Sequence, residues 1–273
     1  MGIVALGSFR SAAVTTSAFA LCRTWPEDRA VLLAEVDPSG GMLAATIGLR
    51  PEPGLQSLAA DARRGLGAGA LDEHAQALSG RVGVLLAPPA AEQVRAALAM
   101  IGDLAKLLRS AKSDVVCDCG RLDRASPVLP LFAVADLALL VVRAELADLD
   151  VLVASMEHSA LDRARLGDRL GLLLISSGPY GAAEVEEAVG IPVVGTLPHD
   201  PGGTRALVAE APRPFALRSA LPRAARTLAA SLAERLDAEG RAVEGAAVEH
   251  SPTESQDLPT RSAAPDAMMK VTR

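Results

Sequence analysis

The sequence predicts an α/β protein with a doubly wound, mostly parallel sheet of about seven strands, helices on both faces and a disordered carboxyl-terminal tail. Seven short runs are apolar at consecutive positions, which is the pattern of strands buried on both faces. Stretches with apolar residues at helical spacing separate these runs, so right-handed βαβ crossovers are expected. Half of the 273 residues are hydrophobic, which is enough for one domain of roughly 200 to 250 residues.

The expected elements follow one another along a single domain, residues 1–237. The amino-terminal run has no basic segment ahead of it, so it is interpreted as the first strand rather than as a signal peptide. The strands are expected at Ile3–Leu6, Val31–Val36, Val82–Ala87, Asp114–Cys117, Leu137–Val142, Leu170–Ile175 and Pro192–Leu197. Helices are expected at Thr16–Trp25, Ala90–Ser110, Leu146–Leu161 and Ala182–Val189.

A further amphipathic helix is expected at Ala220–Asp237. Ser219 can cap its amino terminus, and Pro222 is tolerated in its first turn. Because the helix carries acidic residues and its only large apolar residues are leucines, we expect it to pack on the domain rather than lie in a membrane. Residues 238–273 have no periodicity and almost no large apolar side chain, so we expect them to be disordered. The leucines of the helix stripe are Leu217, Leu221, Leu228, Leu232 and Leu236.

Composition narrows the classes of function. The net charge of -6 and the pI near 5.3 give no indication of DNA binding. No apolar run reaches the roughly 18 residues of a membrane span. Cys22, Cys117 and Cys119 lie in apolar stretches and are expected to be core thiols in a reducing cytoplasm. Two neighbouring cysteines without a further His or Cys pair do not fill a tetrahedral metal site.

In an open α/β sheet the ligand binds at the carboxyl ends of the strands, and two segments there follow the first two strands. The loop of residues 7–17 carries hydroxyl side chains, which either line a phosphate site or cap the next helix. Glu35 and Asp37 end the second strand, where two carboxylates are costly unless they face solvent, a partner or a metal-bound water. Alternatively, Asp37 only opens a turn with Pro38.

Two more segments follow the fourth and seventh strands. Asp118 can hold magnesium through water, and Gly120 allows the backbone to approach a terminal phosphate. The seventh strand ends in the turn Pro198, His199 and Asp200. A lone histidine there is more often a turn residue than a catalyst, and spacing alone supports no Ser/His/Asp triad.

Together these segments resemble the MinD/ParA family of deviant Walker A ATPases, from about Ile3 to Ala211. This resemblance implies the P-loop NTPase fold, with Glu35, Asp37 and Asp118 as catalytic residues. The family's Asp-x-Asp-Pro-x-Gly segment matches Glu35–Gly40, its Walker B and switch segment matches Val115–Gly120, its next strand matches Ala135–Glu145, and its Pro-x-Asp turn near the adenine matches Pro198–Asp200.

The loop that defines the family, Lys-Gly-Gly-x-Gly-Lys-Thr-Thr, is degenerate here, and two registers fit. In the first, Thr15 and Thr16 match the paired threonines, Val14 replaces the P-loop lysine and Phe9 the signature lysine. In the second, Thr16 replaces the P-loop lysine, Ser11 the signature lysine, and Ser17 matches the magnesium-binding threonine. Neither register contains a lysine, because the first lysine of the chain is Lys106. By resemblance, the cofactor-binding residues are Arg10, Ser11, Ala13, Val14, Thr15, Thr16, Ser17, Gly120, Pro198 and Asp200, with Ser17 and Asp118 at the metal.

The resemblance implies a cytoplasmic protein that binds ATP or ADP with Mg²⁺ and positions or partitions cellular cargo, as a homodimer with a protein partner. Arg10 is the only cation near the loop, and its planar fork is not equivalent to a lysine. Because phosphoryl transfer depends on charge stabilisation, we expect weak or absent hydrolysis. One alternative is a pseudo-ATPase scaffold that localises pilus or secretion machinery. A further alternative is a metabolic ligase or a flavodoxin-like binding module, although the sequence shows no second substrate site for either.

Overall fold

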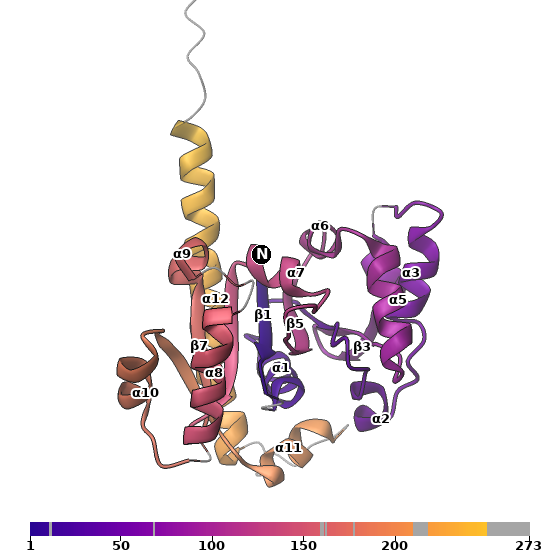
Figure 1. Cartoon of the computed structure of the whole chain (residues 1–273). Coiled ribbons are helices and arrows are strands. Elements are labelled where there is room, and N and C mark those ends of the chain that lie inside the picture. Colours follow the sequence, from indigo (N-terminus) through magenta and orange to yellow (C-terminus); the bar gives the residue numbers. More distant parts are fainter. Residues whose placement is uncertain are drawn as a thin grey trace, which may run out of the picture.

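In the computed structural model, eight strands form one sheet in the order β3-β4-β2-β5-β1-β6-β7-β8 (Figure 1). All neighbouring strands are parallel except β3 and β4, which are antiparallel. This arrangement confirms the predicted doubly wound α/β fold. The strands are β1 (Ile3–Ser8), β2 (Val31–Glu35), β3 (Gln76–Ser79), β4 (Val82–Leu85), β5 (Asp114–Arg121), β6 (Leu137–Arg143), β7 (Leu170–Ser176) and β8 (Val193–Pro198).

The structure describes residues 1–10, 13–67, 69–158, 161, 163–176, 178–209 and 218–249, with side chains for all of them except 158 and 239–249. None of the helices in these stretches is both long and apolar enough to cross a membrane. The helices are α1 (Val14–Arg23), α2 (Leu43–Ile47), α3 (Leu55–Ala62), α4 (Ala70–His74), α5 (Ala91–Ile101), α6 (Leu104–Arg109), α7 (Leu129–Val134), α8 (Leu146–His158), α9 (Arg163–Leu166), α10 (Ala182–Val189), α11 (Pro201–Val208) and α12 (Ala220–Glu249).

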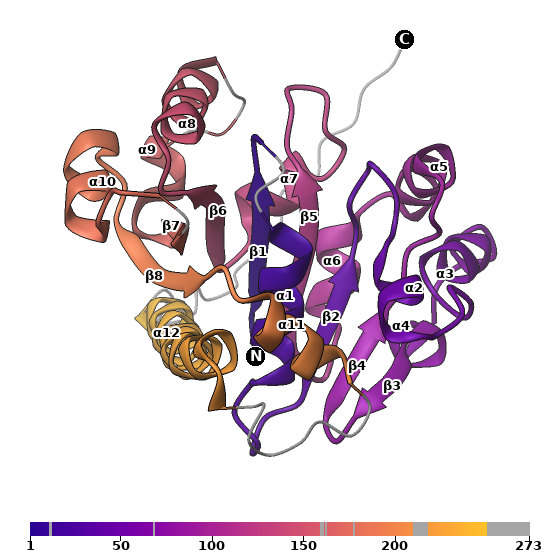
Figure 2. The same cartoon turned by 90° about the horizontal axis from the view of Figure 1, so that it is seen from below.

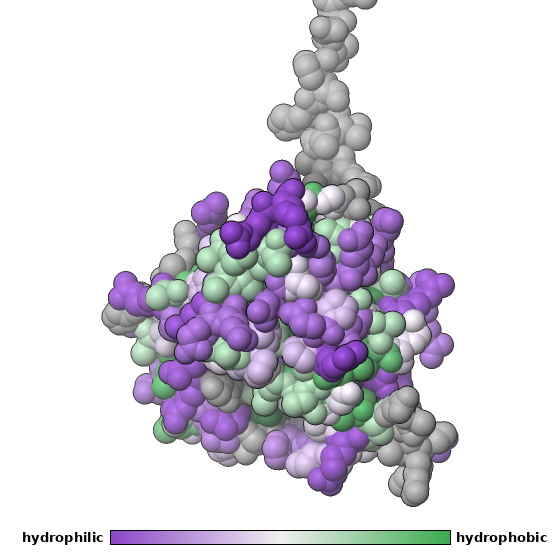
Figure 3. Space-filling model, turned by 90° about the vertical axis from the view of Figure 1, so that its right-hand side faces the viewer, coloured by the Kyte–Doolittle hydropathy of each residue, from purple (hydrophilic) through white to green (hydrophobic). Residues whose placement is uncertain are grey.

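The two faces of the sheet bury separate hydrophobic cores. Helices α1, α11 and α12 cover one face (Figure 2), and α3, α5, α7, α8 and α10 pack on the other. Within β1, Val4 and Leu6 belong to the core on the α1 face, while Ile3 and Ala5 belong to the core on the α8 face. Both faces are buried, which explains why the strands are apolar at every position. The outer surface of α3 and α5 mixes hydrophilic residues with small hydrophobic areas (Figure 3).

Several elements differ from the prediction. The edge strand β3 was not predicted, because its four residues alternate between half-buried and exposed and form no continuous apolar run. The helix predicted at Ala90–Ser110 is divided into α5 and α6 at Gly102, which has a φ of 72°. Asp103 then caps α6 by accepting a hydrogen bond from the Lys106 backbone N–H at 2.9 Å. Strand β5 continues past the predicted end at Cys117 to Arg121, because it keeps pairing with β1.

Helix α12 begins at Ala220, as predicted, and buries Leu221, Leu228, Leu232 and Leu236 against the sheet. It therefore packs on the domain. It ends at Glu249 rather than at Asp237, because residues 238–249 are rich in alanine and glutamate and contain no proline. Leu217 and residues 250–273 lie outside the described residues. The three cysteines are free and buried, which confirms that they are core thiols.

Candidate functional site

The loops that follow β1, β2 and β5 meet at the carboxyl edge of the sheet, opposite the amino terminus (Figure 1). Asp118 lies in β5 at this edge and is fully buried. Its Oδ1 accepts a hydrogen bond from the Gly120 backbone N–H at 3.1 Å, whereas its Oδ2 has no hydrogen-bond partner among the residues that the structure describes. An unpartnered buried carboxylate oxygen is costly, so this atom marks a place where a cation or water would be stabilised.

Burial raises the pKa of Asp118 to about 7, and the nearby Thr15 hydroxyl opposes this shift. The charges of Asp37 and Glu35 raise the pKa further. The two carboxylates of β2 and its loop therefore lie close enough to Asp118 to interact with it. The three predicted acidic residues come together, as expected for neighbouring parallel strands.

Asp37 lies against Gly120. A Cβ atom on Gly120 would come within 1.9 Å of the Asp37 Cγ, and Gly120 has a φ of 57°. Position 120 therefore requires glycine both for its backbone conformation and for this contact. The Asp37 Oδ1 also accepts a hydrogen bond from the Ser39 backbone N–H at 2.8 Å, so the predicted turn exists beside the acidic cluster.

Glu35 is buried, and its carboxylate accepts hydrogen bonds from backbone N–H groups rather than facing an open site. Its Oε1 accepts hydrogen bonds from the backbone N–H groups of Met42 at 2.7 Å and Leu43 at 2.8 Å. Its Oε2 accepts one from the backbone N–H of Ala87 at 2.9 Å. Burial raises the pKa of Glu35, and these N–H groups counteract the increase. Oε1 fixes the loop after β2 and Oε2 fixes the segment after β4, so the geometry gives no support to the water-orienting role that the resemblance implies for Glu35.

The loop after β1 leads into α1 through Ala13, which has a φ of 51° and is the only described non-glycine residue with a positive φ. Val14 begins α1, and its side chain is buried in the core. Thr15 and Thr16 are half-buried, and Thr15 is the hydroxyl that acts on Asp118. Ser17 is buried within α1. This geometry favours the first register, in which Thr15 and not Ser17 lies at the metal position. Ser11, which the second register puts in place of the signature lysine, lies outside the described residues.

Arg10 is half-exposed and pairs with Asp148 of α8, with 3.3 Å between its Nε and the Asp148 Oδ1. Asp148 is buried and also accepts a hydrogen bond from the Arg143 Nε at 2.7 Å. The predicted phosphate cation is therefore engaged by α8. Asp148 was not identified from the sequence, although an aspartate in the first turn of a largely apolar helix is a recognisable signal.

Asp200 caps a helix. Its Oδ1 accepts a hydrogen bond from the Gly203 backbone N–H at 2.8 Å, and its Oδ2 accepts one from the Leu221 backbone N–H at 3.1 Å. These bonds lower the pKa of Asp200 and connect α11 to α12. Pro198 ends the edge strand β8, which β6 and β7 separate from β1. The structure therefore does not bring Pro198 and Asp200 into the acidic cluster.

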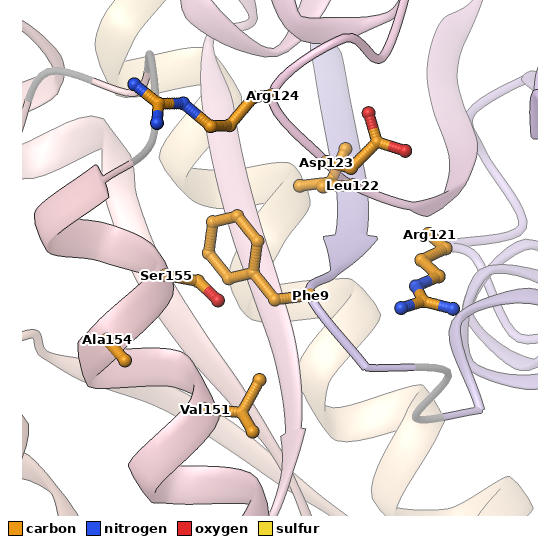
Figure 4. Close-up of a pocket in the computed structure, with 8 residues that line it drawn as sticks. All are labelled: Phe9, Arg121, Leu122, Asp123, Arg124, Val151, Ala154 and Ser155. Atoms are coloured by element: carbon orange, nitrogen blue, oxygen red, sulfur yellow. The ribbon is translucent and has the colours of Figure 1, made fainter.

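A cleft of about 470 Å³ opens beside the loop after β1, between α8 and the segment that follows β5. The Phe9 ring extends into this cleft toward Val151, Ala154 and Ser155 of α8 (Figure 4). In the first register Phe9 occupies the place of the signature lysine. An aromatic ring that faces α8 cannot supply that charge.

The residues at this edge fit a magnesium-bound nucleotide on its metal side. Asp118 has a buried oxygen to which no described residue bonds, and Thr15 offers a hydroxyl beside it. Among the described residues, no three His, Cys, Asp or Glu side chains form a group that could bind a metal alone. A magnesium ion would therefore depend on Asp118, Thr15 and the phosphates of the nucleotide. A strand that turns into a helix beside such a carboxylate is the arrangement of a P-loop α/β protein.

Comparison with solved structures gives the fold more specifically. A ParA family ATPase from Chlorobium tepidum aligns with a TM-score of 0.67 and 17% identity, over 84% of this chain and 98% of that chain. MinD from Pyrococcus horikoshii, solved with Mg-ADP, aligns with a TM-score of 0.66 and 18% identity, over 87% and 98%. MinD from Aquifex aeolicus, solved with MinC, aligns with a TM-score of 0.60 and 13% identity, over 86% and 96%.

These similarities show that the chain has the fold of the MinD and ParA ATPases, as the sequence predicted. No protein-family model matches the chain, and no curated protein matches its sequence.

Proposed function

We propose that this protein is a MinD/ParA-like nucleotide-binding protein that positions or partitions a cellular cargo, with weak or absent ATP hydrolysis. The observation that carries the proposal is the fully buried Asp118, which lies beside Thr15 at the carboxyl edge of the sheet. No hydrogen-bond partner of its Oδ2 is found in the described part of the chain. A buried carboxylate of this kind is retained at a cost to stability, and a magnesium–nucleotide complex would compensate for that cost.

The chain offers specific groups to ATP or ADP. The backbone N–H groups at the start of α1, from Val14 onward, face the position that phosphates take at a helix amino terminus. Thr15 and Asp118 would hold Mg²⁺, which neutralises phosphate charge when bound. Asp37, which lies against Gly120 at the same edge, remains the candidate for orienting an attacking water.

Slow chemistry follows from what the site lacks. Val14 stands in the place of the P-loop lysine and is buried in the core, so it contributes no charge to a transferring phosphoryl group. Glu35 uses both oxygens to hold backbone. Removing such electrostatic groups typically lowers a rate by orders of magnitude, which supports binding of nucleotide without efficient turnover.

The carboxyl edge of the sheet also has exposed apolar side chains that a second copy of the chain or another protein could cover. Met42, in the loop after β2, and Leu146, at the start of α8, are large apolar side chains that are 59% and 68% exposed. Exposed apolar residues beside a ligand site are typical of contact surfaces. The similar MinD structure that contains MinC shows that this fold can present a partner-binding surface. A cytoplasmic homodimer that recruits a protein partner is therefore part of the proposal.

The alternative function is a pseudo-ATPase scaffold that localises pilus or secretion machinery. The ion pair between Arg10 and Asp148 favours it, because the one cation on the loop after β1 is directed to α8. The two functions differ in their response to nucleotide. Light scattering of the purified chain with and without Mg-ATP should show nucleotide-dependent dimerisation if the first proposal is correct, and assembly independent of ATP if the chain is a scaffold.

A further inference from the structure

The proposed nucleotide site has an excess of negative charge. Glu35, Asp37 and Asp118 interact there electrostatically, and a bound nucleotide adds its phosphates. The start of the chain contains no lysine to balance these charges. A protein cation that approaches the phosphates from elsewhere in the fold, in addition to Mg²⁺, would stabilise a bound nucleotide.

Arg10 does not fill this role in the structure. Its guanidinium is directed to Asp148, on the α8 side of β1. Asp148 belongs to the helix that packs on the opposite face of the sheet from α1. Arg10 and the phosphate-binding end of α1 therefore lie on different sides of the strand.

The pairing of β1 with β5 directs a different arginine toward α1. Leu6 pairs with Asp118, but Ser8 pairs with Arg121, so the register shifts by one residue at Gly120. Side chains alternate between the faces of a sheet, and an extra residue reverses the alternation beyond it. The Leu122 backbone N–H still bonds to the Ser8 carbonyl at 2.8 Å, which keeps this segment attached to β1.

The packing on each side confirms the reversal. Cys117, Cys119 and Leu122 all belong to the core on the α8 face. Without the shift, Arg121 and not Leu122 would share the face of Cys119. Arg121 therefore follows the face of Asp118 and α1, although it also contributes to the rim of the cleft beside α8. Figure 4 shows its guanidinium near the chain that leaves β1, with Phe9 between it and α8.

We infer that Arg121 is the phosphate-binding cation of the proposed nucleotide site, in place of the missing lysine. The inference rests on the proposed function. Arg121 is exposed and has no ion pair in the part of the chain that the structure describes. It directly follows the glycine that contacts Asp37, and its planar fork can bind two phosphate oxygens.

The test is a fluorescence titration of the full chain with an N-methylanthraniloyl derivative of ATP in the presence of Mg²⁺. R121Q should weaken binding about 10- to 100-fold, the usual effect of losing charge-assisted hydrogen bonds. R121K should restore part of the affinity. R124Q is the matched control, because Arg124 is an exposed arginine on the same segment. R124Q and R10Q should both bind within about threefold of the wild type.

Competition with adenosine separates phosphate binding from a structural effect. R121Q should leave the affinity for adenosine unchanged, because adenosine has no phosphate. The inference is overturned if R121Q binds the ATP derivative like the wild type, if it loses adenosine to the same degree, or if R10Q causes the loss instead. If the wild type itself does not bind the ATP derivative, the proposed function fails, and the role of Arg121 fails with it.

Discussion

Replacing Asp118 by asparagine should make the metal-free protein more stable at neutral and alkaline pH. Burial raises the pKa of Asp118 to about 7, so the folded protein favours the protonated carboxyl. The stability associated with this group is therefore fully present below about pH 3.8, falls as the pH rises from there to about 7, and stays low above that pH. Asparagine carries no charge and removes that loss.

The size of the effect follows from the shift. Raising the pKa from 3.8 to about 7 corresponds to roughly 4 kcal/mol above pH 7, at about 1.4 kcal/mol per unit. At about pH 5 the folded protein keeps this carboxyl protonated while the unfolded chain ionises it, and the loss of stability is only ~2 kcal/mol. The asparagine amide remains buried, which subtracts about 1 to 2 kcal/mol at every pH. The stability advantage of D118N should therefore grow by roughly 2 to 3 kcal/mol between about pH 5 and about pH 8.

Urea unfolding of both proteins in EDTA, at the two pH values, measures this difference. D114N is the matched control, because Asp114 is buried at the other end of the same strand. Asp114 accepts hydrogen bonds from the Gly2 N–H, from Trp25 and twice from Arg29. The free energy of unfolding of D114N should therefore be about 3 to 5 kcal/mol lower than that of the wild type. A stability difference between D118N and the wild type that does not change with pH would refute the reasoning.

Two further changes test the surroundings of the site. In thermal unfolding, G120A should lower the free energy of unfolding by at least about 1 kcal/mol more than G48A does. Both glycines have a positive φ, but only a Cβ on Gly120 would meet Asp37; equal losses would contradict the contact. D148N should lower the free energy of unfolding by about 1 to 3 kcal/mol, because it removes a buried carboxylate that forms ion pairs with two arginines. R10Q should cost less than about 1 kcal/mol, since Arg10 is half-exposed; the reverse order would show that the pair is assigned wrongly.

The sheet could be predicted because its physical cause is local. Strands covered on both faces are apolar at every position, and this pattern can be read without knowing their partners. The residues of strand β3 alternate between half-buried and exposed and show no such pattern, so only its pairing with β4 defines it. The division of α5 from α6 required knowing that Gly102 takes a positive φ and does not remain in the helix.

The site was predictable in position but not in orientation. Asp37 and Asp118 could be placed at one edge because parallel strands end together. That Glu35 binds backbone, and that Asp148 engages Arg10, depends on loops folding back from residues distant in sequence. The orientation of Arg121 depends on a one-residue register shift between two strands, which no pattern within either strand indicates.

Isothermal titration calorimetry of the wild-type chain with ATP, with and without Mg²⁺, tests the central claim most directly. A buried Asp118 beside Thr15 predicts saturable binding of one nucleotide per chain that weakens when Mg²⁺ is chelated. Phosphate release in the same mixture should be slow or absent. No binding heat up to millimolar ATP with Mg²⁺ would contradict the account and favour the scaffold.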